Sequence, residues 1–180
     1  MSILKSILPF NPLTAVRRNH ALEHATLRIL SLKQPRLNLA GYSDFRGFWV
    51  FGALSTDALQ EAVDEALSRL KAGEYSLAIH PTCGTNFVVS GVAAGSAAWL
   101  GMLGTRNMKS SLERWPLVVG LSTLALLLSH PLGPKMQRAV TTEPRLGDLR
   151  VFEIVRLQRN GRPVHRVVTQ QAQPPRKGQA

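Results

Sequence analysis

Residues 115–134 read WPLVVGLSTLALLLSHPLGP, and residues 86–105 read NFVVSGVAAGSAAWLGMLGT. Both segments are 20 residues long, and neither contains a charged side chain. A helix of about 20 apolar residues is long enough to cross the hydrocarbon core of a bilayer, which is about 30 Å thick. The connection between them, residues 106–114, is short, so the two helices are expected to run antiparallel. The sequence therefore predicts a two-helix transmembrane hairpin within residues 81–136.

Small residues interrupt the first of these segments. Gly91 and Gly95 have the small-xxx-small spacing that lets transmembrane helices approach closely, and Ala97 and Gly101 continue it. The alternative is that the two segments are buried helices of a soluble protein. Basic residues follow the second segment at Lys135, Arg138, Arg145 and Arg150. By the positive-inside rule this favours an integral membrane protein with both termini in the cytoplasm.

The charge of the chain is strongly basic and uneven. There are 22 Lys and Arg against 11 Asp and Glu, which gives a formal net charge of +11. Residues 135–180 hold 10 basic and 3 acidic side chains. Membrane lipids with anionic headgroups are the expected partners of this basic region, at about 1 kcal/mol per basic residue. Nucleic acid is not expected, because no aromatic residue alternates with the arginines near residues 160–161. No protein partner is indicated.

Residues 1–80 have the pattern of a small α+β domain. Asn11 caps a predicted helix over 12–32, with Pro12 at its first position. Two strand-like runs, 36–42 and 46–54, follow as a hairpin. A second helix starts at Ser55 or Thr56 and ends at Gly73, and a short strand is predicted over 75–79. The order helix-strand-strand-helix-strand places helices on one face of an antiparallel sheet.

The C-terminal region contains a second hairpin signal. Residues 149–158 and 162–169 are strand-like and flank Asn160-Gly161, a dipeptide typical of two-residue hairpin turns. We expect a basic β-hairpin within residues 137–170, separate from the N-terminal domain. Residues 171–180 are rich in Gln and Pro, and we expect a disordered tail there.

The first predicted helix carries the sequence HALEH at residues 20–24. His20 and His24 lie one helical turn apart, about 40° from each other around the helix axis. Two histidines at this spacing can bind one metal ion, and a carboxylate beside them can take a proton from metal-bound water. The sequence therefore predicts a zinc site with His20 and His24 as ligands and Glu23 as the catalytic base.

Further ligands are expected from the segment HPTCGTN at residues 80–86. His80, Cys83 or both complete a tetrahedral zinc site, and the pair together leaves little room for a catalytic water. As an alternative, Cys83 is an inert buried thiol. The alternative for His20 and His24 is that they bind no metal and are hydrogen-bonded to neighbouring strands, with Glu23 as their acceptor. Asp44 either stabilises a turn or orients an imidazole.

The HALEH motif resembles the H-x-x-E-H motif of the inverzincin metallopeptidases. The resemblance implies zinc bound by His20 and His24, with Glu23 as general base in peptide hydrolysis. That family completes its site with a glutamate far downstream of the motif. Here no acidic residue lies between Glu74 and Glu113, so the remaining ligands must come from elsewhere.

Three segments also resemble an uncharacterised family of small bacterial membrane proteins: NHALEHAT at 19–26, SDFRGFW at 43–49 and HPTCGTN at 80–86. The resemblance implies membrane association and no mechanism. Two functions are therefore expected from the sequence. The first is a membrane-anchored zinc protein, with metallopeptidase-like hydrolase activity if it is an enzyme. The second is a non-enzymatic membrane assembly or scaffolding protein in which the His/Glu/His motif is structural.

Overall fold

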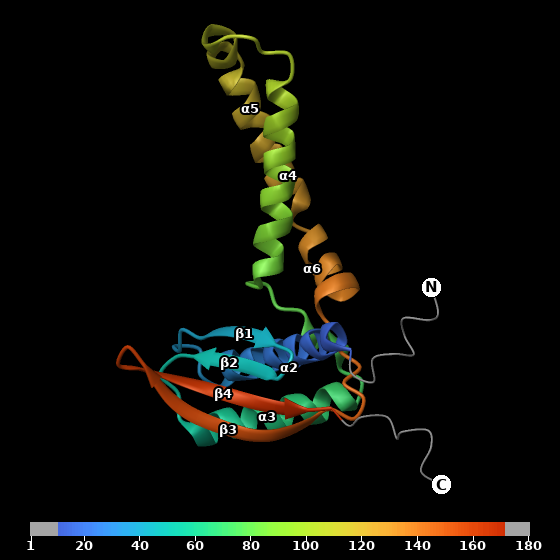
Figure 1. Cartoon of the computed structure of the whole chain (residues 1–180), viewed down its shortest axis with the longest axis vertical. Helices are drawn as coiled ribbons and strands as arrows, with labels where there is room; N and C mark the ends of the chain where they lie inside the picture. The colour runs from blue at the N-terminus through green and yellow to red at the C-terminus, as the bar shows by residue number, and fades with distance from the viewer. Residues whose placement is uncertain (1–10, 172–180) are drawn as a thin grey trace. The chain divides into compact units, whose positions relative to one another are not determined.

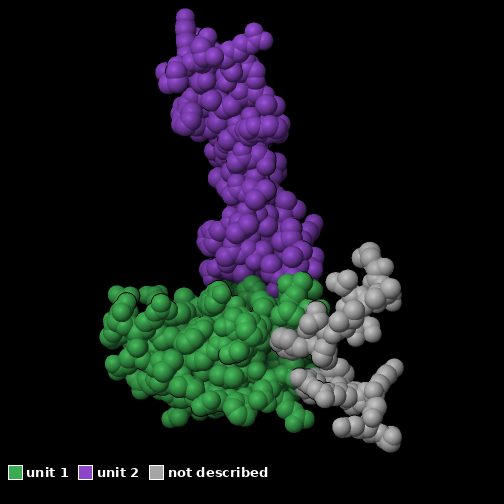
Figure 2. Space-filling view, viewed as in Figure 1, with its two compact units in different colours: residues 1–80, 142–180 green, residues 81–141 purple. Residues whose placement is uncertain are grey.

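The computed structural model describes residues 11–171 of the chain. These residues form two compact units, one built from residues up to 80 together with those from 142 onward, the other from residues 81–141 (Figure 2). The disordered tail predicted for 171–180 lies outside the described residues, except for Gln171. The side-chain oxygen of Gln171 accepts a hydrogen bond of 2.9 Å from Arg18.

The first unit is a mixed α+β domain (Figure 1). Its elements are α2 (Pro12–Lys33), β1 (Ala40–Asp44), β2 (Gly47–Phe51), α3 (Thr56–Lys71), the 3-10 turn η1 (Tyr75–Ala78), β3 (Arg150–Arg159) and β4 (Arg162–Gln170). The Asn11 side chain caps α2 by accepting hydrogen bonds from the backbone of Leu13 and Thr14. Ser55 caps α3 in the same way. The α+β class predicted from the sequence is confirmed.

All four strands belong to one antiparallel sheet in the order β1-β2-β4-β3. The sequence predicts that the C-terminal hairpin is separate from the N-terminal domain. In the structure it is not separate, because β4 pairs with β2 and completes the N-terminal sheet. Phe48 lies opposite Val167, and Val50 lies opposite His165. A two-stranded hairpin alone is marginally stable, so β1 and β2 need this addition to form a sheet.

The core lies between the sheet and the two helices. Its fully buried side chains include Phe48 and Val50 of β2, Leu22 and Ile29 of α2, Leu59 and Val63 of α3, and Val167 of β4. Burial of each large apolar side chain contributes about 1.5–3 kcal/mol. Sequence neighbours of the core residues in β2, such as Trp49 and Phe51, point to the opposite face of the sheet because side chains alternate along a strand.

The prediction of a strand over residues 75–79 is wrong. Tyr75–Ala78 form a 3-10 turn, closed by local hydrogen bonds such as that from Ile79 N to Ser76 O. Leu77 and Ala78 are consecutive and both buried, a pattern that a strand with one face toward the core does not allow. In the sheet, β2 has β1 on one side and β4 on the other, so residues 75–79 have no strand position beside β2.

Asp44 ends β1 and connects the two hairpins. One oxygen of its carboxylate accepts hydrogen bonds from the backbone N–H of Arg46, at 2.7 Å, and from the guanidinium of Arg166, at 2.8 Å. The Arg166 side chain is only 12% exposed, and that of Asp44 is 28% exposed. Asp44 therefore stabilises the turn and pairs with a cation of β4.

Replacing Asp44 with Asn is expected to lower the free energy of unfolding at pH 7. It is also expected to make the free energy of unfolding less sensitive to low pH. Burial alone would raise the pKa of Asp44, but the hydrogen bonds from Arg166 and the Arg46 backbone hold it below the usual 3.8. The unfolded chain therefore binds more protons as the pH falls below about 4, and the free energy of unfolding decreases there. Asp44→Asn should cost about 1–2 kcal/mol at pH 7, because Arg166 loses its partner.

The measurement is denaturant unfolding of the detergent-solubilised chain, followed by circular dichroism at pH 7, 4 and 2. The wild type should lose more stability than the variant between pH 4 and pH 2. Equal losses in the two proteins would contradict the assignment.

The second unit is helical. It contains α4 (Gly84–Met102), α5 (Met108–Ser129), α6 (Leu132–Met136) and the π-helical turn η2 (Gln137–Thr141). Helices α4 and α5 form an antiparallel hairpin, with a hydrogen bond of 3.0 Å from Ser129 to Ser90 at one end. At the other end, Arg114 donates a hydrogen bond of 2.6 Å to the carbonyl of Leu103.

The small residues of α4 contribute unequally to this hairpin. A Cβ atom added to Gly101 would lie 3.0 Å from Val118 Cγ2, so this glycine permits a close approach to α5. Nothing lies within 4 Å of a Cβ added to Gly91 or Gly95. Of the glycines predicted to pack closely, Gly101 does so, and Gly91 and Gly95 do not.

In the described part of the chain, α5 is the one helix long and apolar enough to cross a membrane. Only 6% of its apolar stretch is buried, so α5 is not packed like the core helix of a soluble protein. Helix α4 does not meet the same criterion, because its glycine and serine residues dilute its apolar character. The predicted helical hairpin is thus present, but the prediction that both of its helices cross a membrane is not confirmed, because only α5 is long and apolar enough.

Candidate metal centre

Helix α2 carries the three residues of the HALEH motif. His24 and Glu23 are 2% and 4% exposed, and His20 is half-buried. The rings of His20 and His24 have centroids 4.1 Å apart, as the spacing of one helical turn predicts. The motif therefore lies on a face of α2 that is turned into the protein and not toward solvent.

The hydrogen bond made by His24 fixes the orientation and tautomer of its ring. Its Nδ1 atom lies 2.7 Å from the carbonyl oxygen of Ala78, in the turn η1. A carbonyl oxygen only accepts, so Nδ1 carries the proton and donates it. In the neutral ring this leaves the lone pair on Nε2. Metal-binding histidines commonly donate their other ring N–H to a backbone carbonyl in this way.

His80 lies beside His24, two residues after η1 ends. Their ring centroids are 5.6 Å apart. A zinc–nitrogen bond is about 2.1 Å long, so two imidazoles on one tetrahedral ion have ring centroids about 5 Å apart. The two measured separations, His20 to His24 and His24 to His80, lie within about 1 Å of this value. The first unit therefore brings three of the predicted site residues together.

The protonation of His80 suits a metal ligand. Burial lowers the pKa of His80 to about 4, and the nearby His24 and Arg28 contribute to the shift. At neutral pH its imidazole is therefore uncharged. Metal ions bind this neutral form.

Glu23 is held against strand β1. One oxygen of its carboxylate accepts a hydrogen bond from the hydroxyl of Ser43. Gly41, on the same strand, leaves the space that the carboxylate fills, because a Cβ atom there would lie 2.2 Å from Glu23 Oε1. The sequence SDFRGFW thus contributes a residue, Ser43, that orients the predicted base.

Cys83 belongs to the second unit, where it is the N-cap residue of α4. Its side chain is buried, and its Sγ atom lies 3.5 Å from the hydroxyl of Thr85. It follows His80 by three residues in the chain, so its distance from His80 is limited by chain length. Asp44, in contrast, pairs with Arg166 and the turn backbone, which favours its role in the turn over that of orienting an imidazole.

Two polar residues that were not among the predicted site residues are buried near these elements. Asn19 is fully buried, donates a hydrogen bond of 2.8 Å to the carbonyl of Asp44, and accepts one of 2.7 Å from Thr169. His165 is also fully buried, with Nε2 3.2 Å from the hydroxyl of Thr56. Asn19 precedes the HALEH motif by one residue. Its hydrogen bonds to Asp44 of β1 and Thr169 of β4 anchor α2 to the sheet, and the bond to Thr169 exists only because β4 belongs to this sheet.

Comparison with known proteins gives a family and no activity. Residues 15–154 match the family described as "Domain of unknown function (DUF6391)". An uncharacterized protein of Picosynechococcus sp. (strain ATCC 27264 / PCC 7002 / PR-6) is 41% identical over 98 residues. That match covers 47% of this chain and 48% of the relative, so it spans about half the length of the relative. No solved structure matches the chain. The family match covers more than three quarters of the chain, which therefore belongs to the DUF6391 family.

Proposed function

We propose that this chain is a membrane-anchored zinc-binding protein whose metal site is built on α2. The observation that carries the proposal is the hydrogen bond from His24 Nδ1 to the Ala78 carbonyl, 2.7 Å long, which leaves Nε2 for a metal. The ring centroids of His20 and His80 lie 4.1 Å and 5.6 Å from the ring centroid of His24. Burial of His24 strengthens the bond between a cation and its ligands.

The donor types favour zinc. Imidazole and thiolate ligands together suit Zn²⁺, which binds both in tetrahedral sites. His20, His24 and Cys83 supply two imidazoles and a thiol. His80 supplies a third imidazole, and three residues of chain keep the Cys83 backbone within about 11 Å of the His80 backbone. The proposed ligands are therefore His20 and His24, completed by His80, Cys83 or both, and a site completed by only one of the two keeps a fourth position for a water.

Metal content tests this proposal. The full chain, purified in detergent without chelators, is expected to contain about one zinc ion per chain by inductively coupled plasma mass spectrometry. Protein that contains no zinc, and does not take up zinc when it is titrated in, would overturn the proposal.

Glu23 is the proposed catalytic base if the site is hydrolytic. Its support is its position directly before His24 and the hydrogen bond from Ser43, which orients its carboxylate. Glu23→Gln removes the base but keeps the shape of the side chain and a hydrogen-bond acceptor for Ser43. The variant is expected to keep its zinc and to lower peptide hydrolysis by about 100-fold or more, because general bases contribute about 10²–10⁴-fold.

Hydrolysis of a fluorogenic peptide library by the zinc-loaded wild type is the measurement. Absence of hydrolysis in the zinc-loaded wild type would remove the peptidase role and leave a structural metal site. Unchanged hydrolysis in Glu23→Gln would remove the role of Glu23.

A non-enzymatic assembly or scaffolding function is the second candidate. The observation that favours it is that two of the motif residues bind other elements of the first unit. His24 binds the turn η1 through Ala78, and Glu23 binds β1 through Ser43. These bonds hold α2 against η1 and β1, as a purely structural motif would.

Membrane anchoring is proposed on the basis of α5 and its surface. Exposed apolar side chains along the helix include Leu117, Val119, Leu124, Leu127 and Leu128. A contiguous surface of this kind is unfavourable in water. Because α4 and α5 are antiparallel, both ends of the hairpin lie on one side, and the basic residues that follow α5 support the cytoplasm as that side in this proposal. Extraction of expressing cells with alkaline carbonate should leave the chain in the membrane pellet, and its release would contradict the anchor.

A further inference from the structure

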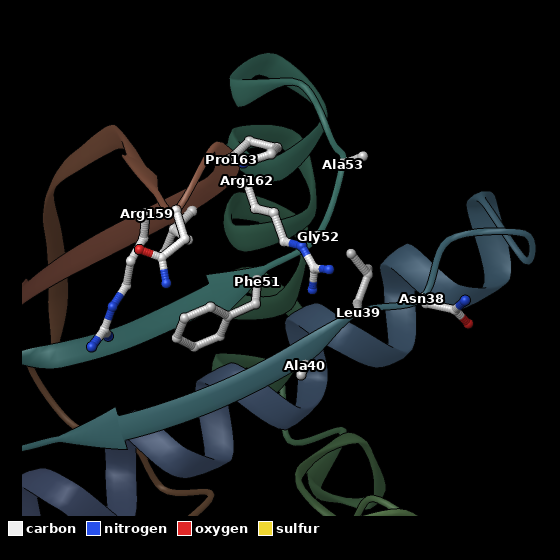
Figure 3. A pocket seen from close by; sticks show the side chains of 11 residues that line it. Asn38, Leu39, Ala40, Phe51, Gly52, Ala53, Arg159, Arg162 and Pro163 are labelled. Atoms are coloured by element: carbon white, nitrogen blue, oxygen red, sulfur yellow. The ribbon is translucent and has the colours of Figure 1, made fainter.

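The first unit contains a cavity that is separate from the histidine cluster. It has a volume of about 670 Å³ and lies where the ends of β1 and β2 meet the turn between β3 and β4 (Figure 3). Cavities that bind small molecules usually measure about 300–1,000 Å³. The residues that matter for the argument are Leu39, Phe51, Gly52, Arg159, Arg162 and Val164.

The floor of the cavity is apolar. Phe51 of β2 lies opposite Val164 of β4 in the sheet register, and opposite Ala40 of β1 on its other side. These residues are on the face of the sheet that points away from the core, because the core residue Val50 precedes Phe51 in the strand. Phe51 is only half-buried, so its ring is available to a bound molecule.

Two arginines supply the charge of the cavity. Arg159 and Arg162 lie opposite each other at the ends of β3 and β4, on either side of the Asn160-Gly161 turn. In Figure 3 the side chain of Arg162 extends from this turn toward Gly52, and that of Arg159 leaves on the other side of Phe51. No acidic residue lines the cavity.

These guanidinium groups differ from three other arginines of the domain. Arg69, Arg166 and Arg18 each form an ion pair with an acidic side chain. Within residues 11–171, neither Arg159 nor Arg162 forms an ion pair or a side-chain hydrogen bond. Their position is set by a rigid type of turn, since Asn160 and Gly161 have φ values of 51° and 73°.

We propose that this cavity binds a phosphate monoester that carries an aromatic or other apolar group. The two positive charges beside the cavity, which has no acidic residue in its lining, match the charge of a phosphate monoester, which is about −1.5 to −2 at pH 7. The Arg162 guanidinium, which extends toward Gly52, contacts the phosphate, and Arg159 adds positive charge on the other side of Phe51. A carboxylate or a sulfate ester carries only one negative charge. Arginine also forms paired hydrogen bonds with phosphate oxygens. The apolar part of the ligand covers Phe51 and Val164.

The experiment is isothermal titration calorimetry of the detergent-solubilised full chain at pH 8. Phenyl phosphate represents a free ligand, and short-chain dihexanoyl phosphatidic acid represents a lipid headgroup with the same phosphate monoester. Phenyl sulfate has the same shape as phenyl phosphate and one charge fewer. We expect at least one phosphate monoester to bind with a Kd below about 1 mM. Phenyl sulfate should bind about tenfold more weakly than phenyl phosphate.

Variants separate the cavity from the general basic charge. Arg159→Gln and Arg162→Gln should each weaken binding of the phosphate monoester about tenfold, because each removes a charged hydrogen-bond donor. Arg150→Gln is the matched control, since it removes the same charge from an exposed position at the opposite end of β3. It should leave the affinity unchanged. Circular dichroism checks that all three variants are folded.

The two ligand arms identify the source. Binding of phosphatidic acid alone supports the site with a lipid as its ligand, and binding of phenyl phosphate supports it with a free metabolite. The proposal is overturned if neither compound binds, if phenyl sulfate binds as tightly as phenyl phosphate, or if Arg150→Gln weakens binding as much as the two cavity variants.

Discussion

Replacing His20 and His24 together with Ala is expected to reduce the zinc content from about one ion per chain to less than about 0.1. Both imidazoles lie on one face of α2, and their rings are 4.1 Å apart, so the double variant removes two of the proposed ligands at once. The two ligands that remain, His80 and Cys83, cannot hold zinc tightly by themselves. Mass spectrometry of protein purified without chelators measures the metal.

The same variant also tests whether zinc stabilises the fold. A ligand that binds only the folded state raises the free energy of unfolding, by about 4 kcal/mol when its concentration is 1,000 times the Kd. A chelator should therefore lower the melting temperature of the wild type and leave that of the double variant unchanged. Zinc in the double variant at the level of the wild type would contradict the proposed ligands.

His130→Ala is the matched control for this experiment. His130 is an exposed histidine at the C-terminal end of α5, outside the cluster. Its removal takes away one imidazole but no proposed ligand, so the zinc content should not change. Because loss of the buried His24 ring can itself destabilise the domain, His20→Gln serves as a milder variant. His20 is only half-buried, and this change should lower zinc affinity while the domain stays folded.

The largest effect on stability is expected from Gly47→Ala. Gly47 starts β2 with φ of +143°, a region that side-chain-bearing residues rarely adopt. A Cβ atom at this position would lie 2.0 Å from the carbonyl oxygen of Val167, which is a backbone atom of β4. The two strands would have to separate to make room. The expected cost is more than about 3 kcal/mol, enough to lower the melting temperature by roughly 10 °C.

Gly161→Ala separates the steric clash from the backbone strain. Gly161 also has a positive φ, of 73°, but nothing lies within 4 Å of a Cβ atom added there. Its replacement should cost only about 1 kcal/mol. Thermal unfolding followed by circular dichroism in detergent compares the two variants. Equal shifts in melting temperature would contradict the prediction, because they would show that the steric clash with β4 adds nothing to the cost of replacing Gly47.

Much of the local structure follows from short sequence patterns. Asn11 and Pro12 mark the start of α2, and the helix ends at Lys33, one residue after the predicted end. The Asn160-Gly161 dipeptide predicts the turn between β3 and β4. Each of these features depends on residues within a few positions of one another, so the sequence alone is informative.

The errors come from segments whose structure depends on distant neighbours. Residues 75–79 have the composition of a strand, but the neighbouring position in the sheet belongs to β4, which is about 90 residues farther along the chain. The same pairing makes the basic hairpin part of the N-terminal domain. In α4, the glycine that packs against α5 is Gly101, because the direction in which each glycine faces depends on how the two helices cross.

The candidate site shows the same division. The spacing of HALEH is enough to place His20 and His24 on one face of a helix, because helical geometry repeats every 3.6 residues. The hydrogen bond between His24 and Ala78 joins residues 54 positions apart, and the pair formed by Asp44 and Arg166 joins residues 122 positions apart. The amino-acid sequence therefore determined the helices, the turns and the pair of neighbouring imidazoles. The tertiary structure alone decided which strand completes the sheet, which carbonyl orients His24 and which arginines within residues 11–171 pair with an acidic side chain, because these contacts depend on how the whole domain buries its apolar surface.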